Sequence, residues 1–316
     1  MPSPPRARAL LAALALTASL TAGCATPWSD NAPPEVSWVK GPVGQRPTVT
    51  IPHEPAPKKA RATVLHEGEG PELRKGQIAV AEVDMWIWEQ RKRFMSTYDQ
   101  QQPTSVTFDG EHVAKTWDQA LIGKRAGSRV LMVAPATHGF GPHGMSPANV
   151  TPTDHLAVVF DLIGAYEPHQ QIPERPGAPV AGFPEVNVPK GQEPTVRWGD
   201  SQAPEKLRSG ALVAGDGARI EDGDKVVVQA TSWVWKDKQP FNSTYLRKTP
   251  NGFLMKEKAL LPGWYEALAG QKVGSRVVIA VPPNQRPGFK FTKGGMATPP
   301  GKPVLHVIDI LDRIPG

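Results

Sequence analysis

The chain has 316 residues, a formal net charge of +6 and a hydrophobic fraction of 39%. Its length favours two domains over one, and its 30 glycines and 35 prolines indicate many turns and extended connections. The basic residues are scattered, without the stripe that follows a nucleic-acid backbone, and the one cysteine excludes an intramolecular disulfide.

Residues 1–23 have the pattern of an export signal. Arg6 and Arg8 precede an apolar run, 9–20, that is too short to act as a membrane-spanning stop-transfer helix. Small residues then lead to Cys24, and this arrangement resembles the lipobox of bacterial lipoproteins. The resemblance implies lipidation of Cys24 and a lipid-anchored place on the extracytoplasmic face of the cell membrane. An ordinary secreted protein cleaved at the same small residues is the alternative.

Two proline-rich segments divide the rest of the chain. Residues 24–61 are expected to form a stalk with partly polyproline II character, because such a composition buries too little apolar surface to fold alone. Residues 167–194 are expected to form a second Pro-rich linker. The pattern of 46–52 returns at 183–189, so part of each lead-in is also consistent with an edge segment of the following domain.

Residues 62–166 have the pattern of a first globular domain. Apolar and β-branched runs predict strands at 63–65, 78–88, 106–108, 130–133 and 156–163. Trp117, Ala120 and Leu121 share one face of a short helix that Gly123 closes. Residues 195–316 repeat this order. One helix against several antiparallel strands predicts an α+β fold for each copy.

The two copies match at a constant offset. Residues 116–130 match 263–277, and 94–98 match 241–245. Trp86 and Trp88 likewise match Trp233 and Trp235, and each pair alternates so that both rings lie on one face of a strand. Core or inter-domain packing is favoured for these pairs over a ligand platform. A register kept over so many positions indicates two copies of one domain.

These motifs together resemble the FKBP-type peptidyl-prolyl cis-trans isomerase family. They comprise the Phe-x-Ser-Thr segments 94–97 and 241–244, the Trp-initiated helices, the turns at Gly127 and Gly274, the strands that end at Pro135 and Pro282, and the closing strands 156–163 and 304–311. The resemblance implies two tandem FKBP-like domains at 62–166 and 195–316. Each would be an antiparallel half-barrel sheet wrapped around one short helix, with an apolar pocket between them.

The resemblance also implies which residues form the pocket. The catalytic walls and floor fall on Phe94, Trp117 and Phe140 in the first copy and on Phe241 and Trp264 in the second. Substrate-binding positions fall on Val83, Met95, Val113, Ala114, Val150 and Val158 in the first copy and on Asn242, Leu260 and Leu261 in the second. Some polar groups of the family are replaced, since Val83 stands where the family has Tyr and Met95 where it has Asp.

The expected activity is therefore an extracytoplasmic peptidyl-prolyl isomerase that assists the folding of exported proteins. Its partners would be proline-containing segments of those proteins and, through the lipid, the membrane, with no nucleic acid. No cofactor is implied, and no metal site is expected because His138, His143 and His155 lack acids or cysteines at ligand spacing. The replaced polar positions keep a second hypothesis open, a non-catalytic peptide-binding chaperone or envelope scaffold on the same fold.

Overall fold

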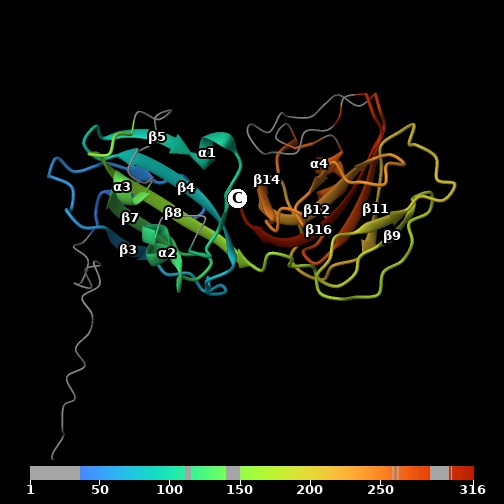
Figure 1. The fold of residues 1–316 in the computed structure, drawn as a ribbon, viewed down its shortest axis with the longest axis horizontal. Helices are drawn as coiled ribbons and strands as arrows, with labels where there is room; N and C mark the ends of the chain where they lie inside the picture. Colours follow the sequence, from blue (N-terminus) through green and yellow to red (C-terminus); the bar gives the residue numbers. More distant parts are fainter. Residues whose placement is uncertain are drawn as a thin grey trace, which may run out of the picture.

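The computed structural model describes residues 36–110, 115–139, 150–257, 260–261, 263–284, 299 and 301–316. The chain forms two domains that lie side by side, each built on a six-stranded antiparallel sheet (Figure 1). The predicted arrangement, two copies of one α+β domain in tandem, is confirmed. Within the described ranges, no helix is long and apolar enough to cross a membrane.

In the described residues of the first domain there are six sheet strands and three short helices. The strands are β3 (Arg61–His66), β4 (Ile78–Ile87), β5 (Lys92–Ser96), β6 (Thr104–Thr107), β7 (Arg129–Pro135) and β8 (His155–Tyr166). The helices are α1 (Thr97–Gln100), α2 (Lys115–Leu121) and α3 (Ala136–Gly139). The strand order is β3-β7-β8-β4-β5, and β6 also pairs with β4. The long central strands β4 and β8 therefore carry the middle of the sheet.

The second domain repeats this topology. Its strands are β11 (Arg208–Val213), β12 (Lys225–Val234), β13 (Asn242–Ser243), β14 (Asn251–Leu254), β15 (Arg276–Val281) and β16 (Val304–Ile314), and its helix is α4 (Trp264–Leu268). The order β11-β15-β16-β12-β13, with β14 beside β12, corresponds to that of the first domain. Even the bulge at Val80/Ala81 has its counterpart at Val227/Val228. The repeat thus preserves local irregularities as well as elements.

One face of each sheet wraps around the helix. On β4, every second residue from Ala79 to Ile87 joins a buried cluster with Trp117, Ala120 and Leu121 of α2. The corresponding cluster in the second domain includes Trp264 of α4. The period of two on the strand and the i, i+3, i+4 spacing on the helix produce this face. Burying each large apolar side chain contributes about 1.5–3 kcal/mol.

The opposite, convex face of each sheet is covered by a small hairpin. The strands β1 (Val39–Lys40) and β2 (Thr48–Val49) form one hairpin, and β9 (Glu185–Asn187) and β10 (Thr195–Arg197) form the other. Composition assigned β1 and β2 to a stalk and β9 to a linker, whereas β10 begins at the first residue of the predicted second domain. Each hairpin is a separate two-stranded sheet rather than an edge of the main one. The hairpins are needed because strands that are apolar on both faces must be covered on both.

The paired tryptophans pack under these hairpins. Trp88 and Trp38 meet edge to face, with ring centroids 5.4 Å apart, and Trp235 meets Trp198 at 5.3 Å. The indole N–H of Trp88 donates to the backbone oxygen of Glu54 at 2.9 Å. The pairs therefore act in core packing, as the sequence favoured, and leave no exposed ligand platform on these strands.

The two domains share an interface at their junction, where the C-terminus lies (Figure 1). Its apolar part consists of Val80, Ile163 and Tyr166 from the first domain and Val227, Leu311 and Ile314 from the second. The Tyr166 hydroxyl donates to Asp312 at 3.1 Å, and the Ser105 hydroxyl donates to the backbone oxygen of Pro250 at 2.6 Å. Apolar burial and paired polar groups thus hold the domains in a defined arrangement.

Lys225 of the second domain reaches into the first. Its ammonium group lies 3.6 Å from the buried carboxylate of Glu82, donates to the backbone oxygen of Gly44 and lies 5.1 Å from the ring centre of Tyr98. The Thr97 hydroxyl also donates to Glu82. Burial raises the pKa of the Glu82 carboxyl, while Thr97 and Lys225 oppose that rise. The junction therefore contains a titratable group whose protonation state depends on folding.

Glu82→Gln should flatten the pH dependence of stability. A carboxyl whose pKa is raised on folding contributes stability that is full below its unfolded pKa and is lost as pH rises through its folded pKa. Gln229 occupies the same place in the second domain and accepts from Thr244, so an amide fits this site. Urea-unfolding midpoints measured from about pH 4 to about pH 8 test this. If the midpoints of the variant and of the natural chain change with pH in parallel, Glu82 does not contribute to the pH dependence of stability.

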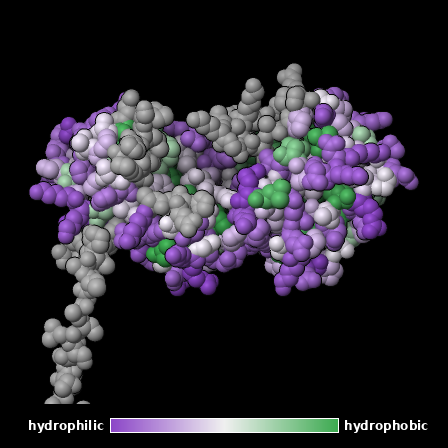
Figure 2. Space-filling model, in the orientation of Figure 1, coloured by the Kyte–Doolittle hydropathy of each residue, from purple (hydrophilic) through white to green (hydrophobic). Residues whose placement is uncertain are grey.

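Figure 2 shows that the surface seen in this view is mainly polar over both domains, with small separate apolar spots. Among the described residues, Leu246 is the large hydrophobic side chain that stands exposed, at 67%. Scattered apolar residues of this kind are usual for a solvated protein. The candidate binding surface therefore has to be sought in the concave faces of the sheets.

Candidate functional site

Trp117 forms the floor of the concave face in the first domain. It lies on α2, is 8% exposed, and meets Phe160 of β8 edge to face, with centroids 4.9 Å apart at 75°. Its indole nitrogen is buried and has no hydrogen-bond partner among the described residues. The helix and the central strand thus hold a large flat apolar surface in one orientation.

The predicted pocket residues of this domain come together around Trp117. Val83, Val150 and Val158 are buried in its cluster, and Phe94 and Met95 of β5 pack against it while remaining half-buried. Phe140, Val113 and Ala114 lie outside the described residues. We use the term apolar bowl for this buried cluster on the helix side of the sheet, with its tryptophan floor, three valines and a phenylalanine–methionine edge.

A threonine anchors the Phe-x-Ser-Thr segment in each domain. The Thr97 hydroxyl accepts the backbone N–H of Val83 at 2.8 Å and donates to the buried side chain of Glu82. Thr244 accepts the N–H of Ala230 at the same distance. These bonds fix the segment against the central strand. The motif therefore positions the neighbouring aromatic wall through a buried hydroxyl.

Trp264 is the corresponding floor in the second domain. It is 2% exposed and meets Phe253 at 5.7 Å and His306 at 5.6 Å, both edge to face. Leu260 and Leu261 are buried in the same cluster, and Phe241 packs against it. Two aromatic rings therefore hold this tryptophan in place.

Asn242 lies apart from that cluster. It is half-buried on β13, and its side-chain oxygen accepts from the guanidinium of Arg247 at 2.6 Å. The amide is thus tied to a neighbouring loop residue. In this structure it is a rim residue and is not part of the apolar floor.

His306 is a pocket residue that sequence reasoning missed. It is 1% exposed, and burial lowers the pKa of its imidazole to about 3, so the ring is neutral near pH 7. The alternation along β16 contained the signal, because His306 shares a face with Val304 and Ile308, which belong to the helix-side cluster. A buried neutral imidazole adds one polar group to an otherwise apolar floor.

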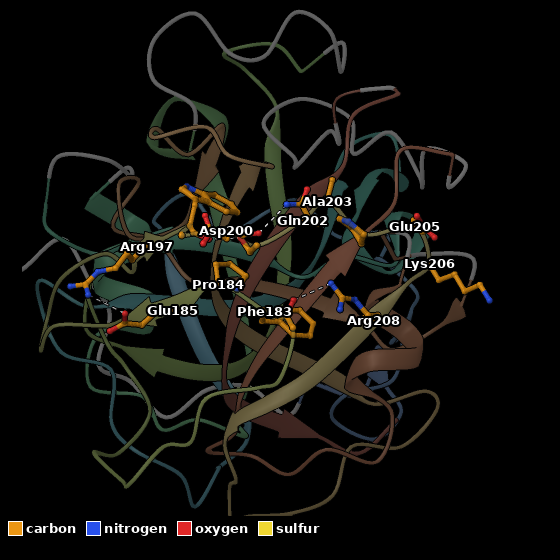
Figure 3. A pocket seen from close by; sticks show the side chains of 15 residues that line it. Phe183, Pro184, Glu185, Arg197, Asp200, Gln202, Ala203, Glu205, Lys206 and Arg208 are labelled. Atoms are coloured by element: carbon orange, nitrogen blue, oxygen red, sulfur yellow. Dashed lines mark hydrogen bonds and ion pairs between the residues drawn. The ribbon is translucent and has the colours of Figure 1, made fainter.

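Cavities among the described residues lie elsewhere, and two of them are beside the hairpins. One, of about 910 Å³, is an open groove of the second domain in which Arg208 lies over the Phe183 ring and Arg197 approaches Glu185 (Figure 3). The other, of about 710 Å³, lies beside the first hairpin and is lined partly by Trp38 and Arg61. Neither contains a residue of the predicted pockets. Their open walls and mixed charges favour no particular chemistry.

Apolar bowls of this kind suit rotation about an Xaa–Pro bond. The barrier of about 18–20 kcal/mol arises from amide resonance, and no covalent intermediate is needed to cross it. A dry pocket favours the twisted amide, because its carbonyl has lost resonance and needs less hydration. Aromatic floors that hold the proline ring can therefore lower the barrier without an acid or a base.

A family model described as FKBP-type peptidyl-prolyl cis-trans isomerase matches residues 70–162 and 217–311, together more than half of the chain. The chain belongs to this family. Both matched regions include a tryptophan floor, so the FKBP-type isomerase assignment applies to each domain. The roles of the individual pocket residues in turnover stay a prediction.

Curated relatives agree with this assignment. The FK506-binding protein of Neisseria meningitidis serogroup B is 31% identical over 105 residues, which are 33% of this chain and 93% of that protein. The FKBP-type peptidyl-prolyl cis-trans isomerase FkpA of Escherichia coli K12 is 27% identical over 135 residues, 41% of this chain and 47% of FkpA. The match therefore spans about half the length of FkpA.

Solved structures include similar FKBP chains. The structure of the three FKBP domains of wheat FKBP73 aligns with 81% of this chain and 94% of its own, at 18% identity and a TM-score of 0.31. FkpA from Escherichia coli aligns with 34% of this chain and 48% of its own, at 27% identity and a TM-score of 0.29.

Proposed function

We propose that this FKBP-type isomerase acts outside the cytoplasm, where it assists the folding of exported proteins by turning their Xaa–Pro bonds. The observation that carries the proposal is the pair of concave faces, each with a buried tryptophan floor, within the two family-matched regions. Proline-containing peptides are the substrates that the family implies. That these belong to exported proteins is the finer part of the proposal, and it rests on the signal-like residues 1–23.

The proposed location is the extracytoplasmic face of the cell membrane, through a lipid on Cys24. The motif before that residue supports it, as does the absence of other cysteines from the chain. Metabolic labelling with a radioactive fatty acid tests the anchor directly. Label should enter the natural chain and not Cys24→Ala, and the variant should leave the membrane fraction. An unlabelled natural chain would contradict the proposal.

A non-catalytic chaperone or scaffold is the second candidate. It is favoured by the apolar residues at positions where the family carries polar groups, namely Val83 and Ala230, which are 1% and 0% exposed, and Met95. Such bowls hold apolar segments without a donor aimed at the twisted carbonyl, so binding would exceed turnover.

A peptide assay separates the two candidates. The full chain is added in catalytic amounts to a chromogenic tetrapeptide with a central Xaa–Pro bond, and the isomerisation rate is followed. The isomerase proposal expects acceleration in proportion to the concentration of the chain. If the folded chain binds unfolded polypeptides yet leaves the rate unchanged, the holding function replaces it.

A further inference from the structure

The two pocket floors differ at one matched position of the central ladder. In the first domain Met85 of β4 lies opposite Val158 of β8, and in the second Ser232 of β12 lies opposite His306 of β16. Met85 and Val158 are 2% and 0% exposed and belong to the helix-side cluster of their domain. The same place is therefore apolar in one pocket and polar in the other.

Ser232 and His306 form a direct contact. The serine hydroxyl lies 2.7 Å from Nδ1 of the imidazole, and the two residues are 0% and 1% exposed. A neutral imidazole has one nitrogen that donates and one that accepts. Because Nδ1 is engaged by Ser232, Nε2 is the ring nitrogen that remains for a further partner.

Nε2 of His306 is buried without a hydrogen-bond partner among the described residues. The ring stands edge to face against Trp264, with an interplanar angle of 82°, and the indole nitrogen of Trp264 is unpartnered as well. Buried polar atoms are normally paired, and leaving them unpaired is unfavourable. Two such atoms at the floor of one bowl favour an occupant that brings its own polar group.

We propose that the Ser232–His306 pair makes the second domain selective for segments in which a neutral amide side chain neighbours the proline. The first domain, with Met85 and Val158 at the same place, selects an apolar neighbour. An amide carries both a donor and an acceptor, so it satisfies Nε2 in either tautomer. This inference rests on the proposed function and assigns complementary substrate classes to the two domains.

Two nearly isosteric peptides test the selectivity in the full chain. They carry Asn–Pro or Leu–Pro at the centre, and the quantity compared is the ratio of their kcat/KM values. Ser232→Met with His306→Val gives the second domain the pair of the first. The Asn–Pro to Leu–Pro ratio should fall by about tenfold, the size expected when a buried hydrogen bond is lost. An unchanged ratio in the folded double variant would overturn the proposal.

A second measurement does not depend on the variant or on turnover. In the full chain labelled with ¹⁵N-histidine, the resonance of His306 Nε2 should shift when the Asn–Pro peptide is added and stay in place with the Leu–Pro peptide. Equal shifts, or none with a bound Asn–Pro peptide, would refute the assigned contact. Failure of the proposed function looks different, since the Asn–Pro peptide would then bind and shift this resonance while neither peptide is isomerised.

Discussion

Asp161→Ala should lower the free energy of unfolding of the first domain by about 3–5 kcal/mol, because it leaves a buried arginine without its counter-charge. Two nitrogens of Arg129, a residue 2% exposed, each donate to the Asp161 carboxylate at 2.6 Å. The same carboxylate accepts from the Tyr98 hydroxyl at 2.6 Å and from the N–H of Gly44 at 2.8 Å. Its removal therefore breaks four contacts around one desolvated charge.

The second domain supplies the matched control. Arg276 donates to Asp309 in the same bidentate way, but its side chain is 15% exposed. Arg129 also donates to the backbone oxygens of Gly41 and Gln45 in the hairpin loop. Asp309→Ala should therefore cost less than Asp161→Ala in urea unfolding. If both variants lost the same free energy of unfolding, neither the deeper burial of Arg129 nor its hairpin contacts would add to the stability that the Arg129–Asp161 pair provides.

Trp117→Ala and Trp264→Ala should each lower the stability of their domain by about 3–5 kcal/mol, the usual loss for a buried tryptophan. Each should also remove the contribution of its domain to isomerisation. A loss of tenfold in that domain's rate corresponds to about 1.4 kcal/mol of transition-state stabilisation, and removal of the pocket floor should reach at least that size. Rates and unfolding midpoints are measured on the same preparations.

Trp235→Ala is the control that separates the floor from the fold. Trp235 is 7% exposed and packs against the hairpin on the convex face, so its loss should destabilise the second domain to a similar extent. Its ring does not belong to the helix-side cluster of Trp264. Below its unfolding temperature, the Trp235→Ala variant should catalyse isomerisation at the same rate as the natural chain. An equal loss of rate in Trp235→Ala and Trp264→Ala would contradict a catalytic role for the floor.

Local patterning was enough to predict the main sheets and the helix. The alternation of buried residues along β4 and the spacing of Trp117, Ala120 and Leu121 are properties of neighbouring residues. The structure shows both features where the sequence predicted them. The hairpins were predicted only in part: the likeness of 46–52 to 183–189 suggested a segment that belongs to each domain, but proline content concealed the short apolar stretch around Trp38 and the pairing into a hairpin. Those residues become buried only against the convex face, a partner remote in sequence.

The arrangement of the two domains was likewise beyond local patterning. Lys225 reads as a surface residue at the start of a strand, yet it is 5% exposed because Glu82 and Gly44 of the other domain surround it. Such contacts depend on how two finished surfaces meet. The constant offset of the repeat predicts that the domains are alike and carries no information about their contact.

The candidate site was predicted in part. The resemblance brought out Phe94, Trp117 and Trp264, and the structure places each in the cluster or against the helix. The resemblance pointed to positions where apolar residues replace polar groups of the family, and His306 is not one of those positions. The alternation along β16 would have been enough to place His306 on the helix-side face, which also contains Val304 and Ile308.

The most direct test of the central claim is the rate of a refolding reaction limited by proline isomerisation, measured with catalytic amounts of the full chain. Uncatalysed, such a step takes about 10–100 s at 25 °C. The account predicts acceleration in proportion to the chain added, lost when Trp117 and Trp264 are both replaced by alanine and kept in the Trp235→Ala control. No acceleration by the folded natural chain would contradict it.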